Sequence, residues 1–349
     1  MKRFVPTWKY LSTLLLLVPL LLLIHNSTRV IPQTRERTVG PTRTEANIKT
    51  DVIRTDVDLV TVDALVLQKN TARVVGDLKQ ADFIVQEDGV LQSISHFSQN
   101  TLPLSVLLLI DRGGCLDPFG SEVRRAALDA LSRLKPTDEI AVMTYHNTAE
   151  LLQEFTRDRR LIERALNRVP PHDESANHCL NRAFFEAASY MAQAANPEGR
   201  RVIVAVTGVT RNFDCADSPS GRAAAQMVYE SGSVVCGIIP HTPDQVMENG
   251  MIRWATRIGG LAGADSMNIQ TLADETGGEI LQDKPENLES TFDTLMTHLR
   301  TRYSLAFVST NKKRDGTVRK LKIDVTPATQ KSRTKLVVKA RKSYIAPRG

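Results

Sequence analysis

The sequence predicts an α/β fold, in which a doubly wound, mainly parallel sheet is inserted between two β segments that pack together as a small β-sandwich. Three observations predict it. Residues 103–111 (PLSVLLLID) form an apolar run that ends at a carboxylate, typical of a strand buried on both faces. Strands and helices then alternate up to residue 301. The flanking segments 51–100 and 302–346 contain strands too few to be stable alone.

The N-terminal residues 1–24 have the pattern of an export signal. Three basic residues (Lys2, Arg3 and Lys9) precede a Leu-rich run at 11–24, and residues 5–10 extend that run to about 20 residues, the length that a bilayer requires. No A-x-A cleavage motif follows, which favours an uncleaved membrane anchor. A cleaved signal peptide remains the alternative. Both place the body outside the cytoplasm, in the periplasm or secreted.

The segments before the α/β region divide into a tether and a β unit. Residues 25–50 are polar, without periodicity, and contain prolines and a glycine, so they are expected to be a linker. The β unit is expected over residues 51–100, where the run at 51–68 alternates polar and β-branched positions. Asp88-Gly89 lies between two extended stretches and predicts a hairpin turn.

The α/β region is expected over residues 101–301. Strands are predicted at 103–111, 139–145, 149–155, 201–207, 233–239 and 279–281. Helices are predicted at 120–134, 158–168, 177–195, 220–231, 266–276 and 285–301. This alternation implies parallel strands joined by right-handed crossovers. Asp111 would then end a central strand at the carboxyl edge, where open α/β sheets bind ligands.

The positive charge is concentrated at the C-terminus. The chain carries a formal charge of +6, but from residue 300 onward 15 Lys/Arg face only Asp315 and Asp324, so that segment carries +13 and residues 1–299 carry −7. Between 318 and 325 the charges alternate with apolar residues, and aromatic residues are few. This pattern indicates that the charges line the solvent face of a sheet, and it argues against nucleic acid as a binding partner. Attraction to anionic lipid or envelope polymer is a second interpretation.

Sequence motifs of common enzymes are missing. The chain has no G-x-S-x-G, no H-E-x-x-H and no P-loop. We therefore expect a protein that is not an enzyme. The alternative is a thiol enzyme in which Asp111 and His178 act on Cys115.

Several stretches together resemble the von Willebrand factor type A fold and, more closely, bacterial VWFA-related proteins of the kind common in acidobacteria. They are DLVTVDALV, LKQADFIVQEDGVLQSISHFS, PLSVLLLIDRGG, LADETGGEI and the ending RYSLAFVST through VVKARKSYIAP. Their ordered arrangement over residues 51–347 carries the likeness. The resemblance implies a recognition module whose strand-edge loops contact a protein partner in the cell envelope.

The resemblance also implies where a metal site would lie. Family members hold Mg²⁺ with D-x-S-x-S after the first strand, a threonine from a second loop and an aspartate after the fourth strand. Asp111 matches the leading aspartate. Gly113 and Cys115 stand at the serine positions, His178 at the threonine and Gly208 at the aspartate. Only one ligand is kept, so the resemblance implies a degenerate adhesion site with no cofactor, and Mg²⁺ is not expected.

Three of the four cysteines fall, by this alignment, in the loops that would surround the metal. They are Cys115, Cys179 and Cys215, while Cys236 lies within a buried strand. The preferred expectation is a Cys179–Cys215 disulfide, with Cys115 bonded to either as the next choice. The alternative is that all four are small buried thiols.

A softer metal is a further alternative for the same edge. Asp111, Cys115 and His178, with Cys179 or Asp214, would suit Zn²⁺ and would make the chain a metal-dependent adhesion module with non-standard ligands. The expected function is instead a metal-free protein-interaction or scaffolding module. The expected binding surface consists of Asp111, Arg112, Gly113, Cys115, His178, Gly208 and Asp214.

Overall fold

The structure is a computed structural model of the 349-residue chain. It describes residues 59–99, 102–113, 119–196, 199–210, 215, 217–241, 267–333 and 335–348. The expected anchor and linker, as well as Cys115 and Asp214, lie outside these residues. Within the described ranges, no helix has both the length and the apolar character needed to cross a membrane.

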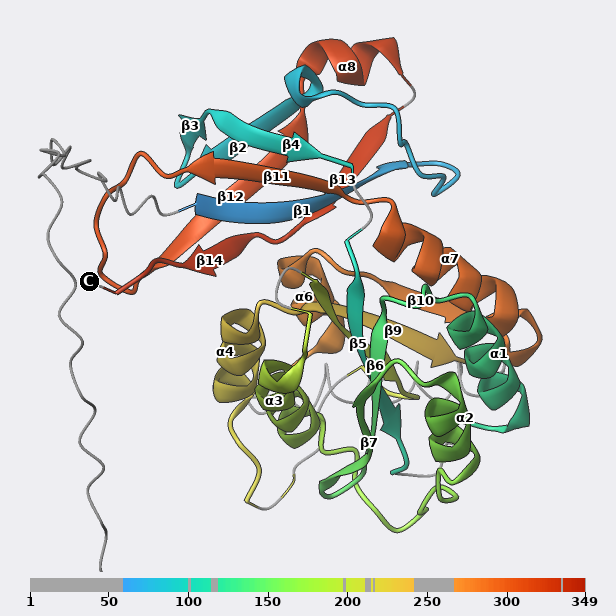
Figure 1. The fold of residues 1–349 in the computed structure, drawn as a ribbon. Coiled ribbons are helices and arrows are strands. Elements are labelled where there is room, and N and C mark those ends of the chain that lie inside the picture. The colour runs from blue at the N-terminus through green and yellow to red at the C-terminus, as the bar shows by residue number, and fades with distance from the viewer. Residues whose placement is uncertain are drawn as a thin grey trace, which may run out of the picture. The chain divides into compact units, whose positions relative to one another are not determined.

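A six-stranded sheet forms the centre of the α/β region (Figure 1). Its strands are β5 (Leu104–Asp111), β6 (Glu139–Tyr145), β7 (Ala149–Thr156), β8 (Arg200–Val206), β9 (Val234–Pro240) and β10 (Ile280–Asp283). Their order is β10-β9-β8-β5-β6-β7, and only β7 runs antiparallel to its neighbour. The predicted doubly wound, mainly parallel sheet is therefore confirmed, and β5 lies between β8 and β6.

Helices cover both faces of this sheet. They are α1 (Ser121–Ser132), α2 (Arg159–Asn167), α3 (Leu180–Tyr190), α4 (Gly221–Ser231), α6 (Ile269–Thr276) and α7 (Leu288–Arg300). Residues of α1, α2 and α7 share one buried cluster, whereas those of α3, α4 and α6 share another. Helix α3 is shorter than the predicted 177–195, because its last turn tightens into a 3₁₀ turn at Met191–Gln193.

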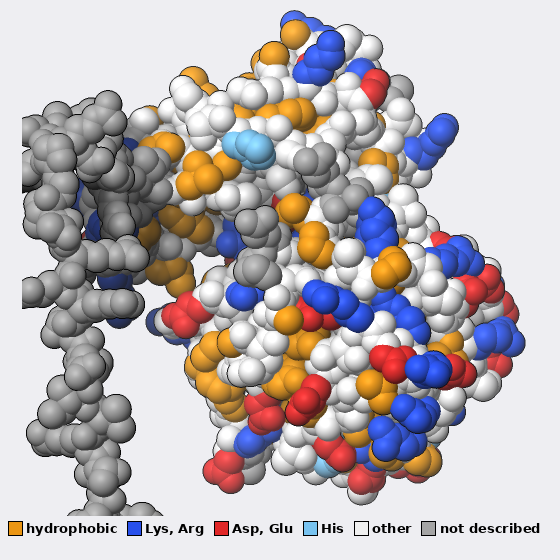
Figure 2. Space-filling model, in the orientation of Figure 1, with side chains coloured by type: hydrophobic (Ala, Val, Ile, Leu, Met, Phe, Trp, Pro, Cys, Tyr) orange, Lys and Arg blue, Asp and Glu red, His pale blue; other side chains and the backbone are white. Residues whose placement is uncertain are grey.

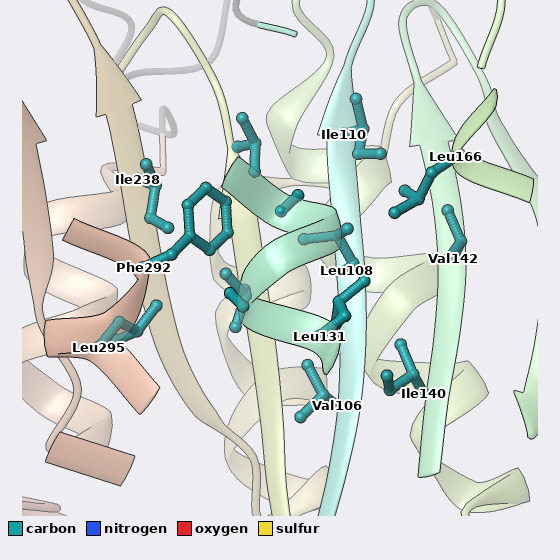
Figure 3. Close-up of a cluster of buried hydrophobic side chains, with 14 of the residues drawn as sticks. Val106, Leu108, Ile110, Leu131, Ile140, Val142, Leu166, Ile238, Phe292 and Leu295 are labelled. Atoms are coloured by element: carbon teal, nitrogen blue, oxygen red, sulfur yellow. The ribbon is translucent and has the colours of Figure 1, made fainter. Parts of the chain in front are cut away.

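Strand β5 supplies side chains to both clusters. Val106, Leu108 and Ile110 point into the cluster with α1, α2 and α7, as Figure 3 shows. Leu107 and Leu109 belong to the cluster on the opposite face. Every residue of β5 is buried, which explains its continuous apolar run. Full burial of each such aliphatic side chain contributes about 1.5–3 kcal/mol.

Two four-stranded antiparallel sheets form the second part, with orders β13-β1-β11-β4 and β14-β12-β2-β3. The strands are β1 (Leu59–Gln68), β2 (Phe83–Glu87), β3 (Val90–Gln92), β4 (Ile94–Ser98), β11 (Tyr303–Val308), β12 (Val318–Val325), β13 (Leu336–Ala340) and β14 (Ser343–Ile345). Each sheet combines strands from before and after the α/β region, and both contribute to one core. This arrangement confirms the predicted packing of the two flanking β segments against each other.

In the sandwich, one local prediction from the sequence is confirmed, the hairpin turn at Asp88-Gly89, and one element was not predicted, a short helix. Asp88 and Gly89 both have positive φ, 48° and 85°, as a two-residue hairpin turn requires. The short helix α8 (Pro327–Ser332) was not anticipated, since only strands were expected in this segment. Thr326 caps α8 by accepting a hydrogen bond from the Thr329 N–H, and Pro327 occupies its first turn.

Buried charged groups join the sandwich to the α/β region. Asp63 on β1 accepts two hydrogen bonds from Arg200 on β8, from Nε at 2.6 Å and Nη2 at 3.1 Å. The Ser304 hydroxyl donates to the same carboxylate at 2.7 Å. Only 2% of the Arg200 side chain and 19% of the Asp63 side chain are exposed. Arg200 and Asp63 therefore form a bidentate ion pair that is largely shielded from water.

A second buried group lies beside β10. Glu279 contacts His298 Nδ1 on α7 at 2.8 Å and Lys339 Nζ on β13 at 3.5 Å. Burial alone would raise the pKa of Glu279, but His298, Lys339 and the charge of Arg302 lower it below its ordinary value. Arg302 itself is buried and donates from Nη1 to the Gly277 carbonyl at 2.8 Å. Glu279 is thus paired with residues of both parts of the fold at the junction, His298 from α7 and Lys339 from β13.

Candidate functional site

The carboxyl edge of the sheet holds a buried polar network centred on Asp111. Its Oδ2 lies 2.7 Å from His178 Nδ1 and accepts a hydrogen bond from Thr207 Oγ1 at 2.7 Å. Its Oδ1 accepts from the Gly113 N–H at 3.0 Å. Asp111 is 1% exposed and His178 6%. Both carboxylate oxygens are therefore engaged by the protein itself.

A tyrosine at the end of the neighbouring strand completes this network. Tyr145, the last residue of β6, donates its hydroxyl to Thr207 Oγ1 at 3.2 Å. Burial, and then the negative charge of Asp111, raise the pKa of Tyr145 well above its ordinary value. The phenol is consequently a neutral hydrogen-bond donor. The ends of β5, β6 and β8 are thereby tied together through side chains.

Loops at this edge are also tied through their backbones. Gly113 forms a bridge with Asp173, whose N–H donates to the Arg112 carbonyl at 2.7 Å. A Cβ at position 113 would lie 2.5 Å from the Asn177 carbonyl oxygen, so only glycine fits without displacing that loop. The Arg112 side chain donates to the carbonyls of residues 170 and 171. Close approach of the two loops brings His178 to Asp111.

A disulfide joins Cys179 and Cys215, with Cα atoms 5.8 Å apart. It is the pairing that the sequence favoured. Cys179 directly follows His178 and precedes α3, and Cys215 lies in the loop after β8. The bond therefore connects two of the three edge loops next to the Asp111 network.

The residues described at this edge do not fit a hard divalent cation. Mg²⁺ needs several oxygen ligands at about 2.0–2.1 Å. Here Asp111 Oδ2 lies 2.7 Å from an imidazole nitrogen and 2.7 Å from the Thr207 hydroxyl, which already donates to it, and Gly208 offers no side chain. The described residues contain no group of three or more His, Cys, Asp or Glu that could hold a metal ion. Cys179 is not a thiolate ligand for Zn²⁺ either, because its sulfur is in the disulfide.

The structure brings together Asp111, Gly113 and His178, but it buries these residues and also Gly208. Only Arg112 among the described members of the expected binding surface is partly exposed. A partner at this edge would accordingly meet the residues around the network. The role of the predicted surface stays a prediction, and Cys115 and Asp214 lie outside the described residues.

Thr207 and Tyr145 are members of the network that the sequence interpretation missed. Each stands at the C-terminal end of a strand of the parallel sheet, and this position was the available signal. Their hydroxyls gain a role only because burial forces polar groups to find partners. A buried strand that ends in Thr or Tyr gives no sign by itself of which neighbour it will meet.

Thiol chemistry has little support among the described cysteines. Cys179 and Cys215 are oxidised, and burial raises the pKa of the Cys236 thiol to about 11. A thiol with that pKa is protonated near neutral pH and is a poor nucleophile. The thiol-enzyme alternative concerned Cys115, which lies outside the described residues.

A family model matches part of the α/β region. Residues 106–210 match the family model of the von Willebrand factor type A domain. No curated protein matches the chain. Among solved structures, an aerotolerance-related membrane protein from Bacteroides fragilis is 15% identical, with 56% of this chain and 98% of that chain covered and a TM-score of 0.40.

Two further solved structures have similar values. BatB from Bacteroides thetaiotaomicron is 12% identical, covers 56% of this chain and 98% of its own, and has a TM-score of 0.40. The vWF domain of the type V pili tip protein Mfa5 from Porphyromonas gingivalis is 12% identical, with coverages of 56% and 95% and a TM-score of 0.38. All three TM-scores are below 0.5. The family match and the observed sheet together identify residues 106–210 as part of a von Willebrand factor type A domain.

Proposed function

We propose that this protein is a membrane-tethered, extracytoplasmic interaction module, without enzymatic activity, that binds a protein partner at the carboxyl edge of its sheet. In this proposal the adhesion site of the family has lost its metal, and contacts within the protein hold the loops instead. The tether and the location rest on the basic, Leu-rich segment 1–24.

The observation that carries the proposal is the contact between Asp111 and His178. The imidazole lies 2.7 Å from the carboxylate at a position where, by the family resemblance, a threonine would serve a cation. Both groups are buried, and the Thr207 hydroxyl and the Gly113 N–H also donate to the carboxylate. The disulfide next to His178 adds a covalent restraint on the loops. A rigid edge of this kind can present loops to a partner without a cation.

The candidate contact surface is the exposed rim around this buried network. Its described residues are Asn147, Asp173, Glu174, Ser175 and Asn177. The Asn177 N–H donates to Asn147 Oδ1 at 2.9 Å, which joins two of these loops. The Glu174 side chain is 81% exposed, so it can be changed with little effect on folding. Loops at this edge of α/β sheets are the usual place for ligands.

The test is capture of a cross-linked partner from envelope extract with the full-length chain, in parallel with Mg²⁺ and with a chelator. We expect the same partner at the same yield in both conditions. Glu174→Arg is expected to reduce the yield about fivefold or more, since a reversed charge at an interface repels a complementary partner. Glu163→Arg, the same change on an exposed position of α2, serves as the matched control and should leave the yield unchanged.

Two results would contradict the proposal. Loss of the partner in chelator would support the metal-dependent alternative. Equal yields from Glu174→Arg, Glu163→Arg and the unaltered chain would show that the partner binds elsewhere on the molecule.

A further inference from the structure

We propose that one end of the β-sandwich docks on an anionic lipid surface. We call this end the tip; it consists of Leu59, Val90, Leu91, Lys312, Lys313, Arg314 and Val318. The inference rests on the membrane-tethered function proposed above and adds to it a lipid contact made by the folded sandwich itself.

Strand pairing places these residues at the same end. Leu59, where β1 begins, pairs with Val308, where β11 ends. The chain from 309 to 317 then leads to Val318 at the start of β12, so this connection lies beside the beginning of β1 (Figure 1). The hairpin of β2 and β3 reaches the same end, because the Thr310 N–H donates to Gln92 Oε1 at 3.1 Å.

Exposed apolar side chains gather at the tip. Among the described residues the large hydrophobics with substantial exposure are Leu59 (55%), Val90 (56%), Leu91 (66%), Leu151 (36%) and Val318 (66%). All of these except Leu151 belong to the tip. Exposed apolar residues scattered singly need no explanation, but their concentration at one end of a small sandwich indicates a contact surface.

Positive charge surrounds these apolar side chains. Lys312, Lys313 and Arg314 are consecutive and exposed, and Lys320 and Arg348 are exposed nearby. The acidic residues Asp88 and Asp315 adjoin the tip, and each accepts a backbone hydrogen bond, from Lys320 and Thr317 respectively. By contrast, Figure 2 shows acidic and basic side chains interspersed over the α/β region. Apolar residues flanked by Lys and Arg suit the interface of an anionic bilayer.

The basic loop is held in place by a buried arginine. Arg319, 3% exposed, donates from Nη1 to Glu87 Oε1 at 3.0 Å and to the Asn311 carbonyl at 2.8 Å. Its Nη2 donates to the Lys313 carbonyl. The lysines are thus presented by an ordered support, and docking would not require the loop to be folded first.

The position of the tether favours lipid over other anionic partners. The apolar run at 11–24 is followed by 34 residues before β1 begins at Leu59, and Leu59 belongs to the tip. A chain anchored by that run would hold the tip near the bilayer and raise its effective concentration there. The scarcity of aromatic platforms argues against single-stranded nucleic acid as the occupant.

The test uses the full-length chain with one added tryptophan, Val318→Trp, in vesicles that contain a lipid quencher in the acyl region. Neutral phosphatidylcholine vesicles are compared with vesicles that also contain phosphatidylglycerol. The unaltered chain, which has Trp8 and Trp254, provides the baseline to subtract. We expect the added tryptophan to be quenched in anionic vesicles only, and Lys312→Glu/Lys313→Glu/Arg314→Glu to abolish that quenching.

Leu151→Trp is the matched control, since Leu151 is an exposed apolar residue on β7, away from the tip. Leu91→Trp replaces Val318→Trp if the latter does not fold. The proposal is overturned if, in anionic vesicles to which the chain is bound, the lipid quencher reduces the fluorescence of the tip tryptophan no more than that of the tryptophan in Leu151→Trp. Failure of the chain to sediment with neutral vesicles would instead contradict the proposed membrane tether. In that case, quenching of the tip tryptophan in anionic vesicles would still show whether the tip contacts lipid.

Discussion

Asp63→Ala is expected to destabilise the protein by about 3–5 kcal/mol, because it leaves a buried arginine without its partner. The Arg200 side chain is 2% exposed and directs two of its N–H groups at Asp63. Without the carboxylate, these groups lose both their hydrogen bonds and the compensating charge. Ser304 also loses its acceptor. The measurement is the free energy of unfolding from urea titration at neutral pH.

The matched control for this variant is Asp77→Ala. Asp77 also forms a bidentate contact with an arginine, Arg333, at 2.6 and 2.8 Å, but its side chain is 69% exposed. Exposed ion pairs contribute little, since water and salt screen them. A much smaller loss is therefore expected. If the two variants were equally stable, burial of the Asp63–Arg200 pair would not be the reason for its effect.

The same group predicts a loss of stability in acid. Burial alone would raise the pKa of Asp63, but the hydrogen bonds and charge of Arg200, with Ser304 and Arg302, lower it below its ordinary value of 3.8. A carboxyl with a lowered folded pKa stabilises fully above its unfolded pKa and loses that contribution as the pH falls through the folded value. The free energy of unfolding should decline below about pH 4, and less steeply in Asp63→Ala. Parallel declines would contradict this assignment.

Cys179→Ser/Cys215→Ser is expected to reduce the free energy of unfolding by about 3–4 kcal/mol. The disulfide closes a loop with a sequence separation of 36, and the cross-link restricts the unfolded chain. Reductant should lower the stability of the unaltered chain to a similar extent and should not affect the double variant. Unfolding measured with and without reductant checks both expectations.

Peptide mapping without reduction distinguishes this pairing from the alternative involving Cys115. We expect one linked peptide pair that contains Cys179 and Cys215. Cys236→Ala is the control, since this buried thiol takes no part in the bond, and its stability should keep the same dependence on reductant. A linked peptide containing Cys115 would show that the loops are joined differently.

Much of the fold was predictable because it depends on local patterns. The burial of both faces of β5 follows from its apolar run, and the hairpin at Asp88-Gly89 follows from residues that tolerate positive φ. The packing of the flanking β segments followed from the instability of isolated strands. Helix α8 was missed because six residues with a polar sequence give no periodic signal.

The candidate site was predictable only in its position. Asp111 was expected at the sheet edge, and the Cys179–Cys215 pair was favoured from the loops that the family resemblance assigned. The hydrogen bond of Asp111 with Thr207 was not expected, nor was the approach of His178 Nδ1 to within 2.7 Å. These contacts join residues 67 and 96 positions apart in the chain, and no local pattern encodes such a distance.

By itself the sequence determined the order of strands and helices, because hydrophobic periodicity and turn residues act over a few neighbouring positions. It also determined that β5 ends in a carboxylate, that of Asp111. Only the tertiary structure decided what that carboxylate meets, since its partners come from separate loops that folding brings together. Burial then requires each polar group to find a partner, and for Asp111 these partners are His178, Thr207 and the Gly113 N–H.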